Sequence, residues 1–221
     1  MNKIFKILLI INTSLFIISL AISFVLLFRP FYYYQINNLK LEQETGYSYN
    51  EIKESYDDVI NYLTLNKEFK TGNLKYSTSG KNHFQDCKIL FNINFIILGI
   101  TTIILLIKNK YLNKLKILNY NLEFFSGCLN IIIILSLLII SFIVGFNNIF
   151  DSFHKIFFLG KDNWLLSPDT DEIIKILPIE YFIRCAILLI SIISIISITI
   201  IIKEMYNKKG GKNVFSTNTI N

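Results

Sequence analysis

The stretch FFSGCLNIIIILSLLIISFIVGF, residues Phe124–Phe146, decides the fold class of this chain, because it contains no charged side chain. An α-helix rises about 1.5 Å per residue, so about 20 residues cross the roughly 30 Å hydrocarbon core of a bilayer. The stretch is long enough for this and lacks the polar face of a helix on a soluble domain. It therefore predicts a transmembrane helix.

Three other runs, at residues 7–28, 89–107 and 182–202, are of similar length and almost as apolar, and Arg184 is the only charged side chain in them. Charged residues make up 17% of the chain, against roughly 25% in soluble domains. Four buried core helices would need far more polar chain to cover them. We therefore predict a mainly α membrane protein with four transmembrane helices. Residues 1–28 are expected to remain as an uncleaved span, because no small-residue cleavage site follows them.

Lysines are distributed unevenly between the two sides that these spans define. The flanks at residues 1–28, 108–123 and 203–221 are rich in lysine, whereas acidic residues balance or outnumber basic ones in 29–88 and 147–181. Lysine-rich flanks stay in the cytoplasm, so both termini are predicted to be cytoplasmic and 29–88 and 147–181 to lie outside. The same charge favours anionic membrane lipid as a partner, and no arginine-rich or RNP-like pattern indicates nucleic acid. The lysines concerned are Lys3, Lys6, Lys108, Lys110, Lys114, Lys116, Lys203, Lys208, Lys209 and Lys212.

Residues 29–88 are predicted to form a small α+β cap outside the membrane. The aromatic residues of Phe31–Leu41 favour a strand, and turns on either side of Leu74–Tyr76 indicate a second, short one. Between them, Ser48-Tyr49-Asn50-Glu51 matches a capping box. It opens an amphipathic helix that is expected to end near Asn66. The apolar face of this helix consists of Ile52, Tyr56, Val59, Ile60 and Leu63.

The second outer segment, 147–181, carries an aromatic helical stripe with i, i+3, i+4, i+7, i+8 spacing, which predicts an interfacial helix that Gly160 ends. Trp164 fits an interfacial anchor. The stripe consists of Phe150, Phe153, His154, Phe157 and Phe158.

The chain has only two histidines, His83 and His154, and both are predicted on the outer side. Asp86 follows His83 by three residues and Asp151 precedes His154 by three, so each carboxylate is within helical reach of an imidazole and is a candidate to fix its tautomer. An imidazole exchanges protons near neutral pH. The pair therefore indicates acid–base catalysis, with a purely structural role for both rings as the alternative.

Other chemistries are less well supported by the sequence. Haem ligation would place the histidines on opposed spans, and zinc would favour a spacing such as HxxxH, which is absent. We therefore predict no metal and no cofactor. The three cysteines are too few for a disulfide framework. A non-enzymatic membrane protein, such as an assembly factor or transporter accessory subunit, remains the alternative function.

The stretch Phe150-Asp151-Ser152-Phe153-His154-Lys155-Ile156-Phe157-Phe158, followed by Trp164, Pro168 and Pro178, resembles the signature of a bacterial membrane protein family, the lipoprotein intramolecular transacylases. The segment His83-Phe84-Gln85-Asp86-Cys87-Lys88 is similar to that family's His-x-x-Asp-x-Lys element. Cys87 departs from the pattern, because an aliphatic residue is expected there.

This resemblance implies a four-span enzyme of the bacterial cell membrane with its active site facing outside. Its substrate would be a diacylglyceryl lipoprotein, whose sn-2 acyl chain moves to the α-amine of the same lipoprotein's N-terminal cysteine and leaves a lyso-form. His83 and His154 would be the catalytic residues, one taking the proton of the amine and the other supplying one to the leaving oxygen. Such a reaction needs a confining site. Candidate walls are Phe150, Phe153, Phe157, Phe158 and Trp164.

Overall fold

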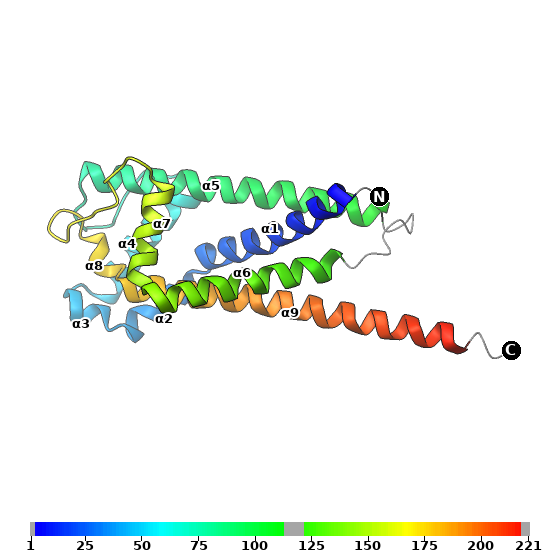
Figure 1. The fold of residues 1–221 in the computed structure, drawn as a ribbon. Coiled ribbons are helices and arrows are strands. Elements are labelled where there is room, and N and C mark those ends of the chain that lie inside the picture. Colours follow the sequence, from blue (N-terminus) through cyan, green and yellow to red (C-terminus); the bar gives the residue numbers. More distant parts are fainter. Residues whose placement is uncertain (1–2, 113–121, 218–221) are drawn as a thin grey trace. The chain divides into compact units, whose positions relative to one another are not determined.

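The computed structural model describes residues 3–112 and 122–217 (Figure 1). Most of the predicted basic loop 108–123, including Lys114 and Lys116, lies outside the described residues, as do residues 218–221 of the tail. The described elements are α1 Lys3–Leu27, α2 Arg29–Asn38, α3 Leu41–Thr45, α4 Tyr49–Leu65, α5 Thr78–Ile107, the π-helical η1 Lys108–Leu112, α6 Leu122–Val144, α7 Phe146–Phe157, α8 Ile173–Ile176 and α9 Ile179–Thr217.

Four of these helices are long and apolar enough to cross a membrane: Lys3–Leu27, Thr78–Lys110, Leu122–Val144 and Ile179–Asn207. They are the four longest helices in Figure 1. Many of their apolar side chains are exposed, among them Phe142 at 91% and Ile132 at 61%. Lipid chains are as apolar as these side chains, so such surfaces are suited to a bilayer. The protein is an all-α membrane protein.

The β part of the predicted α+β fold is wrong, because the described residues contain no strand. The segment Phe31–Leu41 is helical over most of its length, in α2, which has Pro30 in its first turn, a position that proline favours. The buried residues Tyr32, Gln35 and Ile36 follow helical spacing. Packing of this helical face outweighs the β propensity of the tyrosines, which depends strongly on context.

The expected strand at Leu74–Tyr76 is also absent, and only an isolated bridge between Thr71 and Asn73 occurs nearby. Instead, the backbone N–H and carbonyl groups of Lys75 both bond to a single residue, Glu172. Its N–H donates to the Glu172 carboxylate at 2.9 Å, and its carbonyl accepts from the Glu172 N–H at 3.0 Å. These bonds satisfy the backbone without a neighbouring strand.

The chain forms two compact units, and the first comprises Met1–Ala21, Ile96–Ile139 and Leu189–Asn221. In this unit, the Asn130 amide donates to Ser197 Oγ at 3.3 Å and accepts from Ser14 Oγ. A Cβ on Gly127 would lie 3.0 Å from the Ser197 carbonyl oxygen. The short approach shows why a small residue is needed where α6 meets α9, as is usual between membrane helices.

The second unit comprises Ile22–Phe95 and Ile140–Leu188 and contains both histidines. Its core is built around Tyr32, whose ring stacks on Tyr56 at 3.7 Å and meets Tyr181 edge-on at 5.1 Å. The Tyr32 hydroxyl donates to the Ile176 carbonyl at 2.8 Å, which fixes α8 to α2. Arg184 donates to Gln35 Oε1 at 2.9 Å, so its guanidinium has a polar partner.

The helix predicted from the capping box is confirmed as α4, Tyr49–Leu65. Ser48 Oγ accepts from the Glu51 N–H, and the Glu51 carboxylate accepts from the Ser48 N–H at 2.8 Å. Asn66 ends the helix in the left-handed conformation, with φ of 54°. The predicted face is buried: Ile52, Tyr56, Val59, Ile60 and Leu63.

Candidate active site

His83 lies in the second turn of α5, at a helix start that is tightly fixed. The Asp171 carboxylate accepts from the Ser77 N–H at 2.8 Å, and Ser77 Oγ accepts from the Gly80 N–H at 2.9 Å. A Cβ on Gly80 would lie 2.0 Å from Asp171 Oδ1, so only glycine fits against this carboxylate. These contacts hold the first turn of α5 and leave the His83 side chain 8% exposed.

His154 lies on α7 and is also 8% exposed. Its Nδ1 is 2.7 Å from the carbonyl oxygen of Phe150. A carbonyl oxygen only accepts, so Nδ1 carries a hydrogen and Nε2 is the nitrogen that gains or loses a proton. The backbone of α7 therefore fixes the tautomer of this ring.

The two imidazoles face each other in one aromatic cluster. Their ring centroids are 5.7 Å apart, and the buried ring of Phe158 contacts both, at 5.1 Å from His83 and 5.6 Å from His154. Phe150 lies 4.3 Å from His154. Trp164 stacks on His154 at 5.0 Å with an interplanar angle of 27°. Residues 71 positions apart in the sequence are thus brought together.

Two of the predicted walls lie at the edge of this cluster. Phe153 touches His154 edge-on at 5.5 Å but is 46% exposed. Phe157 packs on Phe153 at 4.6 Å and is 53% exposed. The α7 stripe is therefore wider than the site, with Phe150 and Phe158 toward the imidazoles and Phe153 and Phe157 on its outer part.

The two carboxylates predicted to partner the imidazoles, Asp86 and Asp151, lie in other environments. Asp86 accepts from Lys161 Nζ at 2.6 Å and from Asn163 Nδ2 at 2.8 Å. It thereby ties α5 to the loop that carries Trp164, whose indole N–H donates to the Lys161 carbonyl at 3.1 Å. Asp151 is exposed and lines a cavity beside α7. The tautomer of His154 is set by Phe150 and not by Asp151.

Sequence reasoning missed the residues that bond Asp86. Lys161 and Asn163 lie 75 and 77 residues away from it, and no periodic pattern predicts such a pairing. The only local signal was the polar run Lys161-Asp162-Asn163 between Gly160 and Trp164.

Among the described residues, the polar partner of the His83 ring is Cys87, whose Sγ is 3.5 Å from His83 Nε2. Its Nδ1 is buried and has no hydrogen-bond partner among the described residues. Buried polar atoms are almost always bonded, so an unpaired one marks a place where a ligand can bind. The thiol of Cys87 is free, as are those of Cys128 and Cys185.

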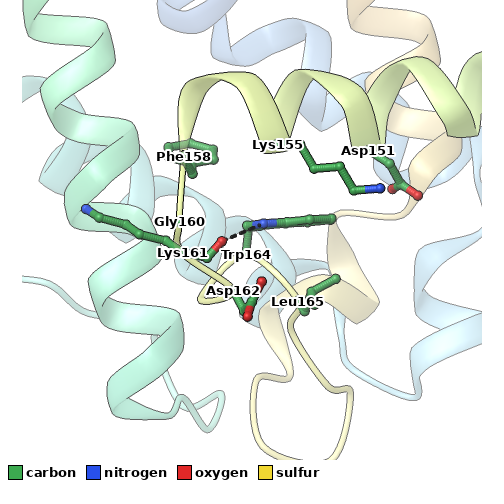
Figure 2. A pocket seen from close by; sticks show the side chains of 8 residues that line it. All are labelled: Asp151, Lys155, Phe158, Gly160, Lys161, Asp162, Trp164 and Leu165. Atoms are coloured by element: carbon green, nitrogen blue, oxygen red, sulfur yellow. Dashed lines mark hydrogen bonds between the residues drawn. The ribbon is translucent and has the colours of Figure 1, made fainter.

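Beside these rings, α7 and the following loop line a half-open cavity of about 510 Å³ (Figure 2). Lys155 and Asp151 extend from α7 toward the indole of Trp164, and Asp162 lies in the loop. In the described part of the chain, no three His, Cys, Asp or Glu side chains are grouped to hold a metal ion.

The fold and the site define a membrane-integral protein equipped for proton-transfer chemistry, with two buried imidazoles among aromatic rings. The family model described as "Lipoprotein intramolecular transacylase Lit" matches residues 7–182, and the chain belongs to this family. It is a membrane-integral lipoprotein intramolecular transacylase. No curated protein sequence matches the chain.

Solved structures agree with this assignment. The in meso structure of the membrane integral lipoprotein intramolecular transacylase Lit from Bacillus cereus is 27% identical, has a TM-score of 0.87, and the match covers 95% of this chain and 97% of that one. Two structures of the same protein with one histidine replaced, by arginine or by alanine, are also 27% identical, with TM-scores of 0.81 and 0.82. Those matches cover 97% and 95% of this chain, respectively, and 94% of theirs.

Proposed function

We propose that His83 and His154 form the catalytic centre of acyl transfer within one lipoprotein. The acyl chain leaves the sn-2 oxygen of the diacylglyceryl group and is transferred to the α-amine of the N-terminal cysteine, which gives a lyso-form lipoprotein. The observation that supports this site best is the buried pair of imidazoles, 5.7 Å apart. Family membership supplies the reaction, and the pair supplies groups that can move its proton.

His154 is the proton carrier in this proposal. An α-amine with a pKa near 8 attacks in its neutral form, and the attacking nitrogen must then lose one further proton to become the amide. With Nδ1–H held by the Phe150 carbonyl, Nε2 accepts that proton. The imidazolium then delivers it to the glyceryl oxygen as the ester C–O bond breaks. The amine proton thus ends on the new hydroxyl, and His154 returns to its starting state.

His83 acts as a hydrogen-bond donor in the same step. Two imidazolium rings at this distance would repel each other, so His83 remains neutral while His154 carries the proton. When the Cys87 thiol donates to Nε2, Nδ1 carries the hydrogen and is free to donate. A donor aimed at the oxygen that becomes negative in the transition state stabilises it and typically contributes about 10²–10³-fold to the rate.

The aromatic rings support this chemistry by confining the substrate. Phe150, Phe158 and Trp164 surround His154 on several sides. Attack of the amine on its own ester closes a medium-sized ring, which is entropically unfavourable unless the reacting groups are held together. Phe153 and Phe157 are partly exposed and suited to contact the acyl chains or the surrounding lipid.

The unit that carries the site is proposed to lie outside the cytoplasm of a bacterial cell, with both termini inside. The support is the lysine bias of residues 1–28, 108–123 and 203–221. The same lysines make anionic membrane lipid a partner of the cytoplasmic face.

The test is to replace each histidine by alanine and to measure the N-acylated product by mass spectrometry. His154→Ala is expected to lower the rate by about 10²–10⁴-fold, the usual value of a positioned acid–base group. His83→Ala is expected to lower it by at least about 10²-fold. Ser152→Ala, on the exposed side of α7, is the control and should keep the wild-type rate. If a histidine variant is present in the membrane at normal abundance and keeps more than a tenth of that rate, the replaced histidine is not part of the catalytic centre.

A further inference from the structure

The cavity beside α7 shares a wall with the proposed catalytic centre. Trp164 stacks on His154 and also lines the cavity, together with Phe158. The remaining lining is largely charged or polar, with Asp151 and Lys155 on α7 and Lys161 and Asp162 in the loop. The volume of about 510 Å³ is within the range of binding pockets for small ligands.

We propose that this cavity binds the first polypeptide residues after the lipidated cysteine of the substrate. This inference rests on the proposed function, which places the cysteine amine at His154. An extended chain advances roughly 3.3–3.6 Å per residue, so one or two residues carry it past the indole of Trp164 into the cavity. Figure 2 shows the charged groups that it meets there.

The charges of the lining select a peptide over an acyl chain. An acyl chain would desolvate Asp151, Lys155 and Asp162 without bonding them, which is unfavourable. A peptide offers carbonyl oxygens to Lys155 and N–H groups to Asp151. Lys161 is engaged by Asp86, whereas no ion pair engages Lys155 in the described part of the chain. Lys155 is therefore the cation available to a substrate.

The apolar residues of the lining complete the argument. The cavity is lined by apolar as well as charged residues, the apolar ones being Trp164, Phe158 and Leu165. It can therefore accommodate an apolar side chain of the substrate peptide together with its polar backbone. The two parts of the substrate therefore bind in different places. The reacting ester lies among the aromatic rings, and the polypeptide extends along α7 in the cavity.

The experiment compares Lys155→Glu with wild-type full-length enzyme on three substrates. These are diacylglyceryl-cysteine amide, which has no following residue, and two diacylglyceryl lipopeptides in which two aspartates or two lysines follow the cysteine. Lys155→Glu is expected to lower kcat/KM for the acidic lipopeptide by roughly threefold to tenfold, as reversal of an exposed charge contact allows. It should raise kcat/KM for the basic lipopeptide and leave the cysteine amide unchanged. Lys67→Glu, an exposed lysine outside the cavity, is the matched charge control.

Three results would overturn the peptide site. One is equal turnover changes on all three substrates, which would place Lys155 in the catalytic centre or the fold. Another is no change on any substrate. The third is a change that follows the fraction of anionic lipid in the vesicles and not the peptide, which would make the cavity a headgroup site. Loss of activity in His154→Ala with all three substrates keeps the proposed function even when the peptide site fails, whereas turnover that is independent of His154 refutes the proposed function itself.

Discussion

The different roles proposed for the two histidines depend on a single backbone carbonyl. Phe150 accepts from His154 Nδ1 at 2.7 Å and leaves Nε2 as the proton-exchanging nitrogen, whereas the Nδ1 of His83 is buried and unpaired among the described residues. A proton carrier and a hydrogen-bond donor respond differently to an amide side chain. An amide can donate a hydrogen bond but does not exchange protons near neutral pH.

His83→Asn is therefore expected to keep more activity than His83→Ala, because the asparagine Nδ2 occupies nearly the position of the imidazole Nδ1. A retained donor should restore roughly tenfold or more of the approximately 10²–10³-fold loss. His154→Gln should be as inactive as His154→Ala, since no amide carries a proton between amine and leaving oxygen. Single-turnover rates at saturating substrate measure the difference. Equal rates for the asparagine and alanine variants of His83 would show that this ring transfers a proton itself.

Sequence spacing predicted the two histidines as a pair but not their partners. A carboxylate three residues from an imidazole is a helical neighbour, yet the i−4 carbonyl of the same helix bonds His154 instead. Asp86 is taken by Lys161 and Asn163, which only the folded chain brings to it. Local periodicity shows which residues share a helix face, and it does not show which long-range partner competes for them.

At the scale of elements, the connection between α7 and α8 acts as the support of the site. Asp86 holds the loop through Lys161 and Asn163, and the loop holds Trp164 on His154. Among the described residues no hydrogen bond joins Asp86 to either imidazole, so we expect Asp86 to act on the reaction through Trp164, as a positioning residue.

Asp86→Ala is expected to loosen the loop and to lower kcat by roughly tenfold with little change in KM, because misplacement near the reacting groups costs rate. Trp164 is the only tryptophan of the chain, so its fluorescence reports the loop directly. Acrylamide should quench it more strongly in Asp86→Ala. Asp86→Asn, which keeps an acceptor oxygen, should lie between the two. Asp169→Ala removes an exposed acid from the same connection and serves as the control. Wild-type quenching in Asp86→Ala would show that the tether does not hold Trp164.

The helices differ in how far the sequence determined them. The capping box and stripe of α4 predicted its start and its buried face, because both are local signals. The tyrosines of α2 favoured a strand, and the stacking of Tyr32 on Tyr56 and Tyr181 outweighed that preference. The stripe of α7 predicted a helix but not which phenylalanines face the imidazoles, since its width exceeds that of the site.

At the scale of the whole molecule, the charge pattern is the basis for proposing on which side of the membrane the site lies. The four candidate spans follow from length and apolarity alone, and these do not distinguish inside from outside. The orientation is predicted from the lysines that flank the spans, because lysine-rich flanks usually remain on the cytoplasmic side. Lys108, the first residue of η1, is buried against Glu123 at the start of α6, so one lysine of this set is also held by an ion pair.

Cysteine labelling tests this orientation. Lys67 is exposed in the segment after α4, in the unit that contains both histidines, and Lys110 is exposed in η1. In intact cells an impermeant thiol reagent should label Lys67→Cys, whereas Lys110→Cys should react only after the membrane is permeabilised. The chain without either substitution controls for Cys87, Cys128 and Cys185, which are partly buried thiols. Because a single span, α5, separates the two positions, the introduced cysteines must report opposite sides in any four-span arrangement. Labelling of Lys110→Cys from outside, with Lys67→Cys protected, would invert the protein and place His83 and His154 on the cytoplasmic side.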